Sequence, residues 1–375
     1  MSTTIDYTKK RDNLIRQYLN EEEIKGNEFL YGQYTLVSAN LLNFLPEIDS
    51  NIHMKLFMQL LVHKQLSKLE QGSAAALSYL RTENLSIGNL NALRNNPAII
   101  CTFHTGSYRI INSFLVQNKV PFALAIGNSI MAAEGEDYIS IYNSLAVGDN
   151  NTGFTIIDAE HPKSGLRMLR ELKSGKSLLL YMDGNSGAGN QTAKNENSCI
   201  VSFLRQQLFA RKGIGFLAHA ANVPIIPVIN YRRGWNDIRL RFYDPIAPDP
   251  HEDRDSFSRQ VTHQLYDIAA DIIRQYPEQW EAWLYLHKVA NISTPVKPSR
   301  GETSGQFVRF NLKDYGIFKI NSKGFLFQKN SYKSYPIEES LFEILGQSIV
   351  QPIAVDNIKM ATLQELEENH VLHYL

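Results

Sequence analysis

Three groups of polar residues could do chemistry, and each lies beside an apolar segment. The first is HTGSYR, His104 to Arg109, directly after the apolar run AIICTF. An imidazole in such a loop can act as a general base, because it exchanges protons near neutral pH. Gly106 would allow a substrate to approach closely or the backbone to adopt an unusual conformation. The alternative is a histidine that only caps or packs, and its position alone favours neither reading.

The second group is YMDGNSG, residues 181–187, which again begins at the end of an apolar run. Asp183 could orient a histidine or bind a substrate hydroxyl or amine, although Asp-Gly is also typical of a simple Asx turn. Asn185 is a candidate substrate-binding residue in the same loop. The glycines match neither the Walker pattern nor G-x-G-x-x-G, so this segment does not indicate a nucleotide site.

The third group consists of cations ahead of the apolar segment IGFLAHAANVPIIPVI: Arg205, Arg211 and Lys212. Together they could hold an anionic head group or a phosphopantetheine arm. For any one of them a solvated face is the commoner explanation. The sequence has no His, Cys, Asp and Glu cluster at metal-ligand spacing and no G-x-S-x-G elbow, so we predict neither a metal site nor an ordinary serine hydrolase.

The elements that must position these groups alternate between strand and helix. Apolar runs predict strands at 98–103, 122–126, 154–157, 177–182 and 225–231, with 237–242 pairing beside the last, and helices at 109–117, 131–145, 163–172, 211–221 and 255–274. Apolar strands separated by helices imply a mostly parallel sheet covered by helices. Ligands in such sheets bind at the carboxyl ends of strands. His104 and Asp183 both lie at such ends.

We therefore predict an α/β fold class with further parts on both sides. Residues 1–292 form the main domain, divided into a helical layer without a strong strand signal (1–94) and the α/β core (95–292). Residues 293–305 are rich in Pro, Ser, Thr and Gly, which predicts a linker. Residues 306–375 read as three short strands and two helices, which predicts a small α+β module.

Composition excludes several classes of protein. The 375 residues contain 38 Lys+Arg and 38 Asp+Glu, a formal net charge of zero that argues against nucleic-acid binding. Two cysteines are too few for a disulfide framework, so a reducing compartment is expected. The amino terminus lacks a signal-peptide core, and the longest apolar stretch, 216–229, is shorter than the ~20 residues of a spanning helix. We expect a soluble, cytoplasmic protein.

In this order, the groups resemble the sequence blocks of the lysophospholipid acyltransferase-like superfamily, especially its lipid A biosynthesis branch. HTGSYR resembles the H-x-x-x-x-D/E block, MDGNSG falls where the second block stands, and RKG followed by FLAHAANVPIIPV resembles the third and fourth. IRQYPEQWEAWLYLHK, residues 273–288, resembles the closing segment of the lipid A branch. The likeness covers roughly residues 35–290.

The resemblance implies an acyltransferase fold, no permanently bound cofactor, and a donor acyl thioester on acyl carrier protein or coenzyme A. His104 would deprotonate an acceptor hydroxyl or amine. The chain departs from the family at Arg109, which stands where the family has an acid and cannot accept an imidazole N–H. Another acid then orients His104, Asp183 being our first choice and Glu134 or Glu136 the next, or His104 works unassisted, or the chemistry is lost. Arg109 could instead bind a substrate carboxylate or phosphate.

A second departure is that we expect neither the membrane-anchoring amino-terminal helix nor the basic surface of the lipid A enzymes. This favours a soluble acceptor: an amino acid, polyamine, peptide or carrier-tethered intermediate. The leading hypothesis is a soluble acyltransferase of lipid or specialised-metabolite biosynthesis. The alternatives are a non-catalytic acyl- or carrier-binding scaffold of the same fold and a thioesterase. The module 306–375 would dock a carrier protein or peptide, or act in dimerisation or as a lid. The candidate site residues are catalytic His104 and Asp183 and substrate-binding Arg109, Ser107, Asn185, Arg205, Arg211 and Lys212.

Overall fold

The computed structural model describes all residues except 1, 19, 146–152, 185–195 and 297–303. Contacts divide the chain into two units, described here one at a time. Unit 1 comprises Met1–Leu19, Met58–Phe203 and Leu208–Ala282, and unit 2 comprises Asn20–Phe57, Leu204–Gln207 and Trp283–Leu375. In the described part of the chain, no helix is long and apolar enough to cross a membrane.

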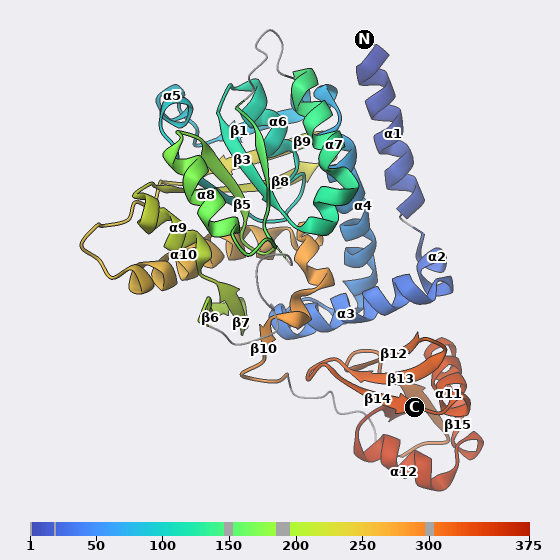
Figure 1. The fold of residues 1–375 in the computed structure, drawn as a ribbon. Coiled ribbons are helices and arrows are strands. Elements are labelled where there is room, and N and C mark those ends of the chain that lie inside the picture. Colours follow the sequence, from blue (N-terminus) through green and yellow to red (C-terminus); the bar gives the residue numbers. More distant parts are fainter. Residues whose placement is uncertain (1, 19, 146–152, 185–195, 297–303) are drawn as a thin grey trace. The chain divides into compact units, whose positions relative to one another are not determined.

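Unit 1 is built on a seven-stranded sheet with the order β1-β9-β8-β2-β5-β3-β4 (Figure 1). The strands are β1 (Leu80–Glu83), β2 (Ile99–Thr102), β3 (Phe122–Ile126), β4 (Thr155–Asp158), β5 (Ser177–Tyr181), β8 (Ile225–Gly234) and β9 (Asp237–Phe242). The pairs from β8 to β4 are all parallel, and β9 runs antiparallel to β8. The predicted mostly parallel sheet is confirmed, as is the pairing of β9 beside β8.

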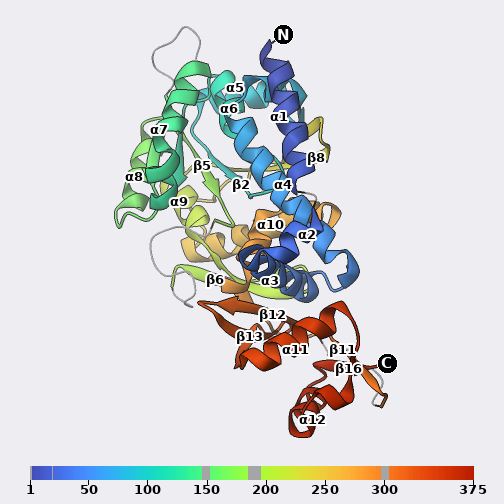
Figure 2. The same ribbon diagram turned by 90° about the vertical axis from the view of Figure 1, so that its right-hand side faces the viewer.

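Helices cover this sheet. They are α1 (Ser2–Tyr18), α4 (His53–Gln71), α5 (Ile87–Asn95), α6 (Ile110–Gln117), α7 (Asn128–Leu145), α8 (Ser164–Lys173), α9 (Gly213–Ala221) and α10 (Arg254–Gln275). In Figure 2, α7 and α8 lie on one side of β2 and β5, and α4 lies on the other. One face of the sheet buries Ile100, Leu179 and Leu240 against Ile111 and Leu115 of α6. These side chains form part of the apolar core of unit 1.

Three predicted boundaries are wrong. The expected helix 211–221 begins only at Gly213, because Gln206–Arg211 forms strand β7, which pairs with β6 (Ser198–Phe203). The helical layer contains a strand, since β1 adds to the edge of the sheet beside β9. Residues 13–23, whose sequence predicts one helix, instead belong to two, and Asn20 caps the second by accepting a hydrogen bond from the Glu22 amide.

Unit 2 combines a helical segment near the amino terminus with the carboxyl-terminal segment. Its elements are α2 (Glu21–Gly26), α3 (Glu28–Phe44), β10 (Ala290–Asn291), β11 (Phe307–Phe310), β12 (Tyr315–Ile320), β13 (Lys323–Gln328), β14 (Lys333–Ile337), α11 (Glu339–Val350), β15 (Ile353–Ala354), α12 (Met360–Glu368) and β16 (Leu372–Tyr374). They form two small sheets, β15-β11-β16 and β12-β13-β14. The predicted domain boundaries stay a prediction, and most of the linker lies outside the described residues.

Unit 2 buries a lysine. Lys329 is 2 % exposed, and its Nζ donates hydrogen bonds to Ser38 Oγ at 2.8 Å and to the Leu312 carbonyl at 2.6 Å. Ser38 Oγ is also 2.9 Å from Nδ1 of His53. Burial lowers the pKa of Lys329 to about 7, so this amine titrates near neutral pH in the folded unit.

Candidate active site

The centre of the candidate site is a hydrogen-bonded pair of side chains at the carboxyl edge of the sheet. His104 follows β2 and Asp183 follows β5, and these neighbouring strands are in register up to Thr102 and Tyr181. Nδ1 of His104 lies 2.8 Å from Oδ1 of Asp183. An ionised carboxylate can only accept a hydrogen bond, so Nδ1 carries the proton of this hydrogen bond. In a neutral imidazole the lone pair then lies on Nε2. The pair is arranged as a general base and its orienting acid.

Three hydrogen-bond donors contact the Asp183 carboxylate: Nδ1 of His104, the backbone N–H of His104 and the indole N–H of Trp280. The backbone N–H of His104 donates to both carboxylate oxygens at 3.1 Å. The indole Nε1–H of Trp280 donates to Oδ2 at 2.6 Å. The Asp183 side chain is only 3 % exposed, whereas that of His104 is 18 % exposed. Charge-assisted hydrogen bonds of this kind fix a carboxylate in one orientation, while the imidazole keeps an edge open to solvent.

Two tyrosines enclose the imidazole. The His104 ring stacks on Tyr181 with centroids 4.5 Å apart and meets Tyr108 edge-on at 4.7 Å. Burial raises the pKa of both phenols, so they remain protonated at neutral pH and are poorly suited to act as a base. The Tyr108 hydroxyl donates to Oε2 of Glu281 at 2.9 Å.

The loop after His104 is fixed by buried polar groups. Gly106 has a φ of +54°, a region that favours glycine. The Ser107 amide donates to Oδ1 of Asn230, and the Ser107 hydroxyl donates to Glu70. Glu70 is itself fully buried and accepts from Nη1 of Arg232 at 2.7 Å. Ser107 is therefore enclosed in a polar network, and a substrate-binding role for it stays a prediction.

Arg109 is also engaged within the protein. Its Nη1 donates to Oε1 of Gln71 at 2.9 Å, to Oε2 of Glu134 at 2.5 Å and to the Tyr138 hydroxyl at 3.1 Å. Burial acts to raise the pKa of Glu134, but hydrogen bonding to Arg109 and the charges of Arg109 and Lys68 lower it overall. Glu134 thus pairs with Arg109, and Glu136 is an exposed residue of α7. Of the three acids considered, Asp183 is the one bonded to His104.

The remaining candidate residues lie elsewhere or beyond description. Lys212 pairs with Asp255 at the start of α10, and Arg211 ends β7. Arg205 belongs to unit 2, where its Nε lies 3.7 Å from Oε2 of Glu47. Asn185 lies outside the described residues. The substrate-binding roles of these residues stay predictions. Within the described ranges, no group of three or more His, Cys, Asp or Glu is arranged to hold a metal ion.

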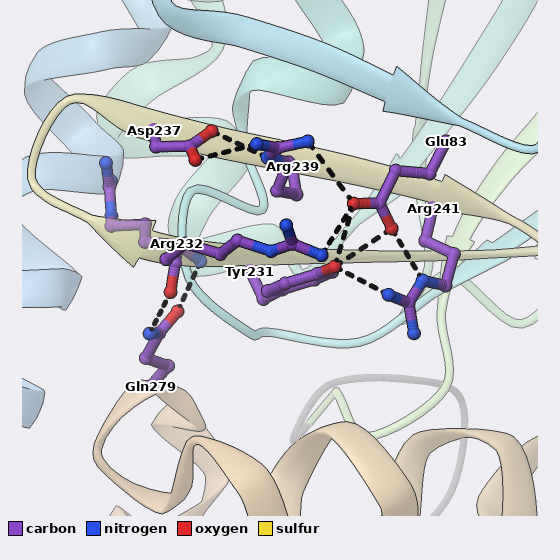
Figure 3. Close-up of polar contacts among 8 residues, drawn as sticks. Glu83, Tyr231, Arg232, Asp237, Arg239, Arg241 and Gln279 are labelled. Carbon is purple, nitrogen blue, oxygen red and sulfur yellow. Dashed lines mark hydrogen bonds and ion pairs between the residues drawn. The ribbon is translucent and has the colours of Figure 1, made fainter.

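The sequence indicates the segment 273–288 only through its resemblance, and the support that its side chains give to the site was not predicted. The side chain of Gln279 holds the end of β8: its Nε2 donates to the Arg232 carbonyl at 2.8 Å, and its Oε1 accepts from the Arg232 amide at 2.7 Å (Figure 3). Beyond it, Tyr231 donates to Glu83, which also pairs with Arg241. The only signal was the aromatic string PEQWEAW, which carries no mark of a role for Gln279 or Trp280.

Comparison with protein-family models and with curated protein sequences gives no match. One solved structure that is similar is the 1-acyl-sn-glycerophosphate (LPA) acyltransferase PlsC from Thermotoga maritima. Its TM-score is 0.34 and its sequence identity 12 %, with 67 % of this chain and 97 % of that chain covered. A TM-score this low does not establish a shared fold. The function proposed below therefore rests on the residues of the site.

Proposed function

We propose that this protein is an acyltransferase that moves an acyl group from a thioester to an amine or hydroxyl acceptor. The observation that carries the proposal is the hydrogen bond between His104 and Asp183. Nε2 of His104 takes the acceptor proton as the acceptor attacks the thioester carbonyl. A C–N or C–O bond forms, the C–S bond breaks, and the leaving thiolate receives the proton from the imidazolium.

The surroundings of His104 support attack by an external acceptor rather than by the protein. Among the described residues, the one side-chain hydrogen bond of the His104 ring goes to Asp183. The Ser107 hydroxyl is directed to Glu70. Burial raises the pKa of Cys101, so its thiol is a poor nucleophile. A base without an adjacent protein nucleophile suits direct transfer in one displacement.

The donor and acceptor classes belong to the same proposal. The ordered sequence blocks support an acyl thioester of coenzyme A or acyl carrier protein, without a permanently bound cofactor. A soluble or carrier-tethered amine or hydroxyl compound is the proposed acceptor, and the cytoplasm the proposed location. The scaffold alternative was suggested by Arg109, but the bond to Asp183 supplies an acid without position 109. If water is the acceptor, the same base makes a thioesterase.

The test offers purified protein a panel of acyl thioesters of coenzyme A and carrier protein with pooled amines and alcohols, and follows free thiol and product mass. We expect thiol release that depends on an acceptor and falls by about 100-fold or more in His104→Ala. The matched control His251→Ala removes an exposed histidine and should leave the rate unchanged. Release without an acceptor would indicate a thioesterase, and a folded protein inert toward every donor would favour the scaffold.

A further inference from the structure

We propose that Trp280 is a positioning residue for the His104–Asp183 pair. Its indole N–H binds Oδ2 of Asp183, which keeps Oδ1 directed at the imidazole. The catalytic consequence rests on the function proposed above, but the positioning itself can be measured on the protein alone.

The backbone sets the position of the indole. The Gly106 amide donates to the Gln279 carbonyl at 2.9 Å, and the Glu281 amide donates to the His104 carbonyl at 2.8 Å. Between them, Thr105 and Trp280 form an antiparallel β-bridge. The residues on both sides of Trp280 are thus tied to the loop that carries the base.

Side chains anchor the same segment at both ends. Gln279 is bonded to the backbone of Arg232 on β8 (Figure 3). The Glu281 carboxylate accepts from Tyr108 and lies 3.3 Å from Nζ of Lys64. A segment held at both ends leaves the indole little freedom to turn away from Asp183.

Burial makes this single hydrogen bond matter. Trp280 has no exposed surface, and its ring packs against Phe203 with centroids 5.3 Å apart. Without the indole donor, the one hydrogen bond left to Oδ2 of Asp183 from the described residues is the contact it shares with the His104 amide. A buried carboxylate oxygen that loses a donor is strongly disfavoured, and the carboxyl group would rotate or admit water. Either change loosens the imidazole.

The first measurement records the Trp280 indole ¹H–¹⁵N resonance of the full chain at one pH, with Trp280→Phe used for its assignment. We expect the resonance to lie downfield and the indole N–H to be protected from exchange with solvent, because a buried carboxylate accepts its hydrogen bond. Both features should be lost in Asp183→Ala and kept in the control Asp271→Ala, which removes an exposed carboxyl group. A resonance that Asp183→Ala leaves unchanged overturns the proposal.

The second measurement is kinetic. Trp280→Phe keeps most of the ring and removes the donor, and we expect kcat to fall roughly 10- to 100-fold with KM nearly unchanged. The matched control Trp283→Phe alters another fully buried tryptophan three residues further on and should change kcat far less. Equal effects of the two variants would show that only packing matters. If the native protein transfers no acyl group, the proposed function fails, while the resonance still decides the role of Trp280.

Discussion

Replacing Asp183 by Asn should abolish most of the acyl transfer, because the structure dictates which way the new amide points. An amide has one oxygen that accepts and one nitrogen that donates. The indole of Trp280 can only donate, and it contacts the Oδ2 position at 2.6 Å, so the amide oxygen must take that position. The amide nitrogen then faces Nδ1 of His104 across a distance of about 2.8 Å.

In that arrangement the asparagine donates to Nδ1, and the imidazole proton moves to Nε2. His104 can then no longer accept a proton from the acceptor at Nε2. The wrong tautomer in an otherwise intact Ser-His-Asp site costs about 10⁴-fold in kcat, and we expect a loss of similar size here. The His104 amide stays satisfied, because it now contacts both carboxylate oxygens at 3.1 Å and needs only one of them.

The same geometry predicts an unusual double variant. In Asp183→Asn combined with Trp280→Phe, the amide is free to turn its oxygen toward Nδ1, which restores the productive tautomer. We expect the double variant to be about 10-fold or more faster than Asp183→Asn alone. Independent effects would instead make it slower than either single variant.

The assay is the rate of acceptor-dependent thiol release by the native protein, both single variants and the double variant, with the His104 tautomer read from its ¹⁵N shifts. Asp271→Asn is a matched control, since the side chain of Asp271 is 82 % exposed and forms an ion pair with Arg274 on the same helix. The reasoning is refuted if Asp183→Asn retains the native tautomer, or if the double variant is slower than Asp183→Asn.

Three further changes test other parts of the structure. The first is Lys329→Met. Because burial lowers the pKa of Lys329 from 10.5 to about 7, folding releases a proton between these two pH values. In urea unfolding, the free energy of unfolding of the native protein should rise by roughly 2 kcal/mol from pH 7 to pH 9, and that of the variant should not. The second is Gly106→Ala, in which the new Cβ would lie 2.9 Å from Oδ1 of Asn230 at a φ of +54°. Thermal unfolding should show a free energy of unfolding lower by about 2 kcal/mol, and the rate of thiol release should fall at least about 10-fold. The third is Arg109→Glu, which places a second carboxylate beside Glu134. It should lower the free energy of unfolding by about 3 kcal/mol or more in thermal unfolding and should not raise the rate of thiol release.

Each of these three has a control and a contrary outcome. Lys333→Met removes an exposed lysine of the same unit, and a pH slope that changes there but not in Lys329→Met would contradict the assignment. Gly165→Ala adds a Cβ with no atom within 4 Å, so it should be tolerated. Higher activity in Arg109→Glu would show that position 109 can still supply the acid of the site.

The central strands β2, β3 and β5 could be predicted because they are buried on both faces. Such strands read as unbroken apolar runs, and the segment 122–126 coincides with β3. The hairpin β6–β7 was missed although its residues alternate between buried and more exposed positions. Its basic residues Arg205 and Arg211 were interpreted as part of a binding group rather than as part of a hairpin. Its turn contains Leu204 at a φ of +54°, and a leucine gives no sign of a turn.

The site was only partly predictable, because its parts come together through strand order. Carboxyl ends of parallel strands share one edge, so His104 and Asp183 were expected at the same edge. Their direct contact requires β5 to lie between β2 and β3, although β3 and β4 precede β5 in the chain. Residue spacing carries no information on that order. Trp280 reaches Asp183 across 97 residues, and no local pattern in the sequence indicates such a contact.

Because Asp183 follows a neighbouring strand, the proposed site depends on contacts between residues that are far apart in the sequence. In the arrangement that the resemblance implies, the histidine and its acid lie within one short block, and local structure keeps them together. Here they are 79 residues apart, and position 109 holds an arginine that instead joins Gln71, Glu134 and Tyr138. The alignment of base and acid must then come from the β2–β5 pairing and from the segment around Trp280.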